Sequence, residues 1–145
     1  MTSYTRHVGS DAAVVEMAHT VRRHVFMEEQ GVSEAVEMDG KDDAATHVVL
    51  TDDETPVATA RLRFVDASTA KIERVAVLSD YRGDGLGDRV MDAAERVAVD
   101  RGATDAVLHA QVRVQGFYER VGYTAVGDTF EEADIPHVEM RKRLD

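Results

Sequence analysis

Three glycines within five residues stand at the junction of a strand pattern and a helix pattern, and this junction constrains the fold most. Apolar and polar residues alternate over residues 71–78, as in a half-buried strand. Residues 86–101 carry apolar side chains at helical spacing, and Gly102 ends the pattern. Gly83, Gly85 and Gly87 lie between them. Glycine lets the main chain approach a ligand, and the free N–H groups of a helix start attract anions. The loop is therefore predicted to bind phosphate oxygens.

The rest of the chain adds two helices and six strands. Apolar residues at helical spacing predict a helix over residues 11–30, and a short helix is expected over 114–121. An acidic loop with a short helical turn is expected over 32–45. The remaining strands are predicted at residues 4–8, 46–51, 56–65, 105–110, 123–130 and 136–144. The order β-α-β-β-β-α-β-α-β-β predicts an α/β (α+β layered) fold with a mixed sheet, and residues 1–145 form one domain.

The composition is that of a soluble domain with an acidic surface. The 145 residues include 28 acids against 17 bases, which gives a net charge of −11 and argues against binding to nucleic acid or phosphate backbones. No apolar run is long enough to span a membrane, and a cytoplasmic location is expected. The scarcity of lysine beside many dispersed acids favours a halophilic source. With no cysteine and six scattered histidines, no metal site is expected.

The glycine loop fits one phosphate-binding pattern and not two others. Asp88 follows Gly87, so the loop lacks the Lys-Ser/Thr of a Walker motif, and its glycines do not have the dinucleotide-binding spacing. The pattern Arg82-x-x-Gly85-x-Gly87 instead resembles the signature of the GNAT superfamily of acyl-CoA-dependent N-acyltransferases. The strand before it and the amphipathic helix after it agree with that setting.

Further segments carry the same resemblance. The block Gln111-x-x-x-Gln115-Gly-Phe-Tyr118-Glu-Arg-Val-Gly122-Tyr is similar to another part of the superfamily, and residues 21–30 and 135–140 resemble its ElaA-like subgroup. The resemblance implies a mostly antiparallel sheet of six or seven strands, splayed between its fourth and fifth strands, with helices on both faces. It also implies that acetyl-CoA enters the splayed region as cosubstrate. Similar enzymes are often dimers, so a homodimer is expected as one possibility.

The resemblance assigns coenzyme binding to the fourth strand and the loop after it. Backbone groups of the strand would bond the pantetheine arm, and loop amides would surround the diphosphate. Asp84 is an unfavourable charge in such a loop, so its side chain is expected to point to solvent. The residues assigned to coenzyme binding are Val75, Ala76, Val77, Arg82, Gly83, Asp84, Gly85, Leu86, Gly87 and Gln111.

Acyl transfer to an amine needs a base and an acid, because an alkylammonium is mostly protonated at neutral pH. Glu73 is the first choice as base, since strict alternation would put it on the strand face of Val75 and Val77. His137, His109 and a water chain are alternatives. The motif places Tyr118 where its hydroxyl could protonate the departing sulfur.

The sequence thus predicts an N-acetyltransferase that moves an acetyl group from acetyl-CoA to a primary amine by direct attack in a ternary complex. The acceptor is a small molecule or peptide, and the acidic surface weakly favours a cationic one. Glu29 and His137 are candidate acceptor-binding residues. Two alternatives stay open, a non-catalytic CoA-binding sensor or interaction domain and the transfer of a longer acyl group.

Overall fold

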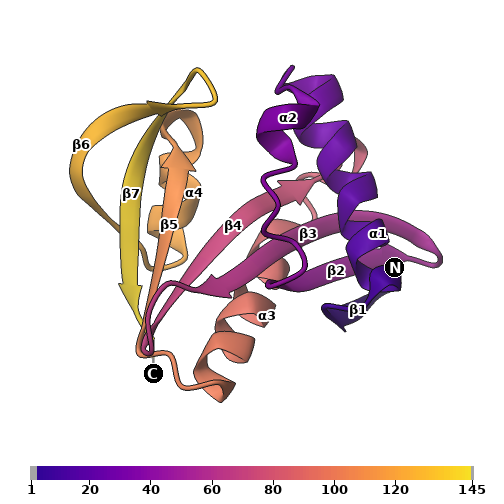
Figure 1. Cartoon of the computed structure of the whole chain (residues 1–145). Coiled ribbons are helices and arrows are strands. Elements are labelled where there is room, and N and C mark those ends of the chain that lie inside the picture. The colour runs from indigo at the N-terminus through magenta and orange to yellow at the C-terminus, as the bar shows by residue number, and fades with distance from the viewer. Residues whose placement is uncertain (1–2, 145) are drawn as a thin grey trace.

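A seven-stranded sheet with the order β1-β2-β3-β4-β5-β7-β6 forms the centre of the computed structural model, which describes residues 3–144 (Figure 1). All neighbours are antiparallel except β4 and β5, which run parallel. The mixed, mostly antiparallel sheet predicted from the sequence is confirmed. The strands are β1 Tyr4–Gly9, β2 Thr46–Asp52, β3 Thr55–Phe64, β4 Thr69–Val77, β5 Asp105–Gln111, β6 Thr124–Glu132 and β7 Ile135–Arg143.

Helices cover both faces of this sheet, as expected. The helix α1 (Ala12–Arg22) and the π-helical segment η1 (Arg23–Glu29) pack on one face, followed by α2 (Glu34–Glu37). The helices α3 (Leu86–Asp100) and α4 (Gln115–Arg120) pack on the other, joined to the strands by the 3₁₀ turns η2 (Ser79–Tyr81) and η3 (Val112–Val114). No helix within residues 3–144 is long and apolar enough to cross a membrane.

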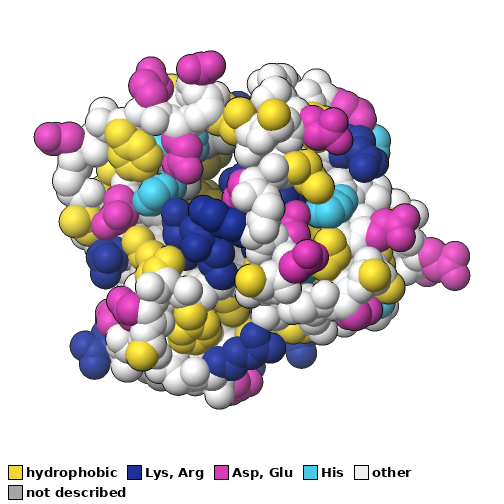
Figure 2. Space-filling view, viewed as in Figure 1, with side chains coloured by type: hydrophobic (Ala, Val, Ile, Leu, Met, Phe, Trp, Pro, Cys, Tyr) yellow, Lys and Arg dark blue, Asp and Glu magenta, His cyan; other side chains and the backbone are white. Residues whose placement is uncertain are grey.

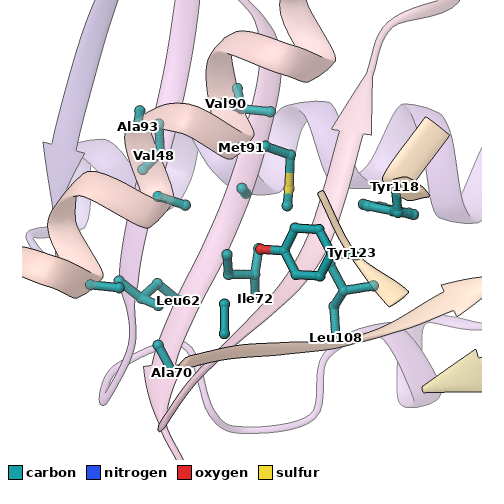
Figure 3. Packing of buried hydrophobic residues seen from close by; sticks show 14 of the residues in the cluster. Val48, Leu62, Ala70, Ile72, Val90, Met91, Ala93, Leu108, Tyr118 and Tyr123 are labelled. Atoms are coloured by element: carbon teal, nitrogen blue, oxygen red, sulfur yellow. The ribbon is translucent and has the colours of Figure 1, made fainter. Parts of the chain in front are cut away.

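The main core lies between α3 and the sheet. Val90 and Met91 of α3 pack against Leu62, Ile72 and Leu108, all nearly inaccessible to solvent (Figure 3). Fully burying each such side chain contributes about 1.5–3 kcal/mol, so this layer provides a rigid support for the loop before α3. The helical spacing predicted for residues 86–101 is therefore confirmed.

The sheet opens between β4 and β5. These strands pair only through Thr69–Lys71 and 105–107, although β4 continues to Val77 and β5 to Gln111. Beyond the three pairs the two strands diverge, as Figure 1 shows. This gap, called the wedge below, confirms the predicted splay between the fourth and fifth strands.

The helix predicted over residues 11–30 changes its winding halfway. After Arg22 the chain continues as a π-helix, and the N–H of Gln30 donates to the carbonyl of Val25 five residues earlier at 3.1 Å. The wider winding lets both Val25 and Phe26 pack on Ala76 of the sheet. Apolar spacing alone did not reveal this change, because a π-helix keeps most of the same face buried.

A β-bulge in β4 overturns one sequence-based expectation. Glu73 pairs with Arg61 and Ala76 pairs with Thr59, so β4 has one residue more than β3 in this interval, and Arg74 has a φ of 54°. The extra residue reverses the alternation of side chains. Val75 and Val77 pack on the α3 side, whereas Glu73 and Ala76 lie on the α1 side. The expectation that Glu73 shares a face with Val75 and Val77 is wrong.

Candidate active site

A cavity of about 920 Å³ fills the wedge. Its walls come from β4, β5, the glycine loop, α4 and the turn between β6 and β7. On the α1 side the molecule is visibly hollowed, with Lys and Arg side chains gathered near the centre of the face (Figure 2). Most of the predicted coenzyme-binding residues line the cavity, namely Val75, Ala76, Val77, Arg82, Gly83, Gly85, Leu86, Gly87 and Gln111.

The glycine loop presents a row of free backbone donors. Gly83 and Gly85 have φ values of 93° and 78°, which side-chain-bearing residues rarely adopt. Within residues 3–144, the N–H groups of residues 83–88 donate to no protein acceptor, and α3 has no side-chain cap. These donors and the dipole of a 15-residue helix favour a bound anion. The loop therefore suits a diphosphate.

Gly87 has a different reason to be glycine. A Cβ atom at this position would lie 3.1 Å from Cζ of Phe117, which is closer than an ordinary contact. The glycine thus lets the first turn of α3 approach α4. The signature spacing joins two needs, a left-handed turn at residue 85 and close helix packing at residue 87.

The arginine of the signature is already engaged. Its Nε donates to the carbonyl of Val77 at 2.9 Å, and its two terminal nitrogens donate to the carboxylate of Glu29 at 2.6 and 2.8 Å. The hydrogen bond from Arg82 lowers the pKa of Glu29. Glu29, predicted to bind the acceptor, does not line the cavity and instead pairs with Arg82. Asp84 is exposed, accepts a hydrogen bond from the Tyr4 hydroxyl at 3.3 Å, and points away from the cavity as expected.

Tyr118 lies on the α3 side of the wedge. Its ring packs edge-on against Phe117 and Tyr123, and only 9% of the residue is exposed. The residue lines the cavity, and its hydroxyl makes no hydrogen bond to another described residue. Burial raises the pKa of Tyr118, so the phenol stays protonated at neutral pH and can donate a hydrogen bond.

Glu73 lies among cations on the α1 side of the wedge. Its carboxylate accepts hydrogen bonds from Arg61 and Arg63, and Nζ of Lys71 lies 3.3 Å away. Burial opposes ionisation, but the hydrogen bonds and charges of Arg63 and Arg61 outweigh it and hold the pKa of Glu73 at about 2. The group lines the cavity, yet it is a weak proton acceptor.

Two histidines line the opposite wall. His137 is buried on β7, and its Nδ1 lies 2.6 Å from the carbonyl oxygen of Ile135. A carbonyl can only accept, so Nδ1 carries the proton in the neutral ring and Nε2 keeps a lone pair. His109 of β5 lies 3.1 Å from Glu132 and 3.7 Å from Glu139. Lys71 pairs with Val107 of β5, so residues 107, 109 and 111 share the face of Lys71. His137 pairs with Gln111, so both histidines lie on this face, the α1 side.

Gln111 connects the two sides of the wedge. Its Nε2 donates to Oε1 of Gln30 at 2.9 Å, and its own Oε1 accepts from Nε of Arg113 at 2.9 Å. Gln30 follows η1 and Gln111 ends β5, so the bond links the α1 layer to the far half of the sheet. Both glutamines line the cavity.

Sequence reasoning missed a buried ion cluster beside the cavity. Arg22 pairs with Glu37 and Asp42, Arg61 pairs with Asp39 and Asp42, and Arg74 pairs with Glu37 and Asp39. Burial opposes ionisation of Asp42, but hydrogen bonds from Arg22 and His19 outweigh it and lower its pKa. The available signal was a pair of arginines, 61 and 63, on one face of an otherwise small and apolar strand. Within residues 3–144 no group of three or more His, Asp or Glu is arranged to hold a metal ion.

Comparison with known proteins agrees with this geometry. Residues 9–144 match the family model described as acetyltransferase (GNAT) domain. YyaT of Bacillus subtilis is 40% identical over 127 residues, which cover 86% of this chain and 85% of YyaT. A crystal structure of a candidate N-acetyltransferase from Lactobacillus plantarum is 33% identical, covers 99% of both chains and superposes with a TM-score of 0.93. Escherichia coli ElaA, at 24% identity, 99% and 100% coverage and a TM-score of 0.86, shares the fold. The chain belongs to the GNAT acetyltransferase family.

Proposed function

We propose that this protein transfers an acetyl group from acetyl-CoA to the amino group of an acceptor. The main support for this proposal is one cavity that runs through the wedge, from the free N–H groups of residues 83–88 to the histidines on the α1 side. Coenzyme and acceptor can therefore meet from opposite faces of the sheet. Membership of the acetyltransferase family supports the reaction class.

The donor side is built for coenzyme A. The amides of the glycine loop and the N-terminus of α3 hold the diphosphate. The edge of β4 between Val75 and Val77 faces the wedge and bonds the amides of the pantetheine arm as an added strand would. Acetyl-CoA supplies the acyl group as a thioester, and in this proposal the N–H of Val75 polarises its carbonyl.

Tyr118 acts as the acid. Its protonated hydroxyl has no protein partner within the described chain and borders the cavity, so it is available to donate to the departing sulfur. A phenol with a raised pKa keeps its proton at neutral pH, so it can donate a hydrogen bond to the sulfur as negative charge develops there.

His137 acts as the base, in preference to Glu73. Its Nε2 has a free lone pair, while Glu73 is held by three cations at a pKa of about 2. A carboxylate with so low a pKa accepts a proton poorly at neutral pH, so Glu73 is the weaker candidate. Glu73 then has a positioning role, since it fixes Arg63 and Lys71 beside the cavity.

The reaction is a direct attack. The amine nitrogen forms a bond to the acyl carbon, the carbon–sulfur bond breaks, Nε2 of His137 takes a proton from the attacking nitrogen, and the Tyr118 hydroxyl gives one to the sulfur. Thiol release from acetyl-CoA across a panel of primary amines tests the activity. Saturable CoA binding without thiol release would favour a binding module, and faster release from longer acyl-CoA donors would revise the acyl group.

A further inference from the structure

Together with Glu73 and the two further cations that pair with it, the ion cluster beside the cavity contains more cations than anions. Its five cationic side chains face four carboxylates, although the whole chain has 28 acids against 17 bases. Figure 2 shows basic side chains in the centre of this face and acidic ones mainly around it. The cations are Arg22, Arg61, Arg63, Lys71 and Arg74, and the carboxylates are Glu37, Asp39, Asp42 and Glu73. The cluster also touches His19 and His47 through Asp42, and burial lowers the pKa of His47.

Lys71 is the cation with the weakest partner. Arg22, Arg63 and Arg74 reach carboxylate oxygens at 2.7–2.8 Å. Nζ of Lys71 lies 3.3 Å from Glu73 and makes no hydrogen bond within residues 3–144. The side chain is only 17% exposed and lines the cavity. The side chain is mostly buried while its ammonium has unused donors, so an anionic group in the cavity can accept from it.

We infer that Lys71 binds an anionic group of the acceptor, so that the acceptor is an amine that also carries a carboxylate. This inference rests on the proposed acetyl transfer. Lys71 is on the same face as His109 and His137, where the amine would lie. The cation excess reverses the preference for cationic acceptors expected from the acidic surface, because a contact inside the cavity outweighs long-range steering.

The position of Lys71 also constrains the length of the acceptor. Lys71 and Val75 are four positions apart on β4, which corresponds to about 13 Å along a strand, less the shortening at the bulge. The lysine side chain spans part of that distance. An acceptor that reaches both the thioester and Lys71 therefore has several atoms between its amine and its carboxylate.

The test compares matched acceptors and matched variants. The acceptor with its amine and carboxylate at opposite ends, 5-aminopentanoate, is compared with pentylamine, and dipeptides are compared with their C-terminal amides. An aminoalkyl phosphate tests whether a phosphate replaces the carboxylate. Wild-type protein should favour the carboxylate-bearing members by about tenfold or more in kcat/KM, mainly through KM. Lys71→Gln should abolish that preference by raising KM for the carboxylate-bearing members, with the affinity for coenzyme A unchanged, whereas Lys71→Arg should retain most of the preference.

Lys41→Gln is the matched control. Lys41 also lines the cavity but is exposed and forms no ion pair within the described chain. If Lys41→Gln removes the preference for carboxylate-bearing acceptors as fully as Lys71→Gln does, the preference comes from the general electrostatic field of the cavity, and a direct contact with Lys71 is refuted. A wild-type protein indifferent to the carboxylate, or one that favours the phosphate, also overturns the inference. Calorimetric titration of 5-aminopentanoate into CoA-saturated wild type and Lys71→Gln measures binding of the anion even if no thiol is released. Failure of the anion contact is thereby distinguished from failure of the proposed acetyl transfer.

Discussion

Arg82 and Glu29 form a bidentate ion pair between the glycine loop and the end of the π-helical segment, with N–O distances of 2.6 and 2.8 Å. They are 53 positions apart in sequence. The pair occupies the guanidinium that the signature motif supplies next to the row of free amides. A phosphate at those amides must therefore compete with a carboxylate of the same chain for Arg82.

Removing the competing carboxylate should strengthen coenzyme binding. Both side chains are about two-fifths exposed, and exposed pairs contribute about 0.2–1 kcal/mol. Glu29→Gln should therefore raise the affinity for coenzyme A by up to about fivefold, and Arg82→Met should lower it. Calorimetric titration at two salt concentrations measures both. Equal affinities for wild type and Glu29→Gln would show that Arg82 does not reach the phosphates.

Tyr118→Phe should lower kcat without loss of stability. The hydroxyl has no protein partner within residues 3–144, so its removal leaves no buried group unsatisfied, while loss of a general acid costs about a hundredfold or more in rate. Tyr123→Phe is the matched control, because its hydroxyl donates to Glu95 at 2.9 Å. That change should cost about 1 kcal/mol of stability and leave kcat intact. A fully active Tyr118→Phe protein would refute the acid role.

The pH dependence of turnover separates the two candidate bases. If His137 takes the proton, His137→Gln should lower kcat about a hundredfold and flatten the rise of kcat with pH, measured from about pH 5 to 8. Glu73→Gln should leave the shape of that profile unchanged, because a carboxyl with a pKa of about 2 is already ionised throughout the range. A profile flattened by Glu73→Gln alone would return the base role to Glu73.

Glu73 should instead matter for stability in acid. Its pKa falls from 4.5 in the unfolded chain to about 2 in the folded protein, so its stabilising effect is full above about pH 5 and disappears as the pH falls towards 2. The difference, at about 1.4 kcal/mol per pKa unit, corresponds to about 3 kcal/mol. Urea unfolding of wild type and Glu73→Gln at pH 7 and pH 3 measures it. Wild type should lose more than half of its advantage at the lower pH, and a gap that stays constant would contradict the linkage.

Gly87→Ala should disturb the junction between α3 and α4. The new methyl group meets Phe117 at 3.1 Å, and overpacking of this kind costs about 1–3 kcal/mol. Stability and coenzyme affinity should both fall, because the first turn of α3 carries the free amides. The double variant with Phe117→Leu should recover much of each. If the double variant is as impaired as the single one, crowding at Phe117 is not the cause.

The sequence predicted most of the fold because its signals were local. Seven strands, the helix after the glycine loop and the ends at Gly102 and Gly122 each follow from periodicity and turn chemistry within a few residues. The β4 bulge was hidden because residues 71–78 alternate without a break, and only pairing with β3 reveals the extra residue. Glu73 was therefore placed on the wrong face.

The ion cluster was hidden for a different reason. Asp39 and Asp42 lie in a loop, whereas Arg22 and Arg61 lie on a helix and a strand far away in sequence. Apart from the pair of arginines 61 and 63 on one strand face, nothing near these residues distinguishes them from solvated surface charges, and only the packed structure gives each its partners. The residues proposed to bind coenzyme were easier to find, because all of them except Gln111 lie within residues 75–87, around the glycine loop.

β4 and β5 are held together by only three residue pairs at one end of the wedge. Ala70 and Ala106 form the middle pair, and both are fully buried. Backbone hydrogen bonds hold the two strands about 4.8 Å apart there, and both methyl groups point into the core, so the width of the wedge depends on how far the strands diverge beyond Lys71.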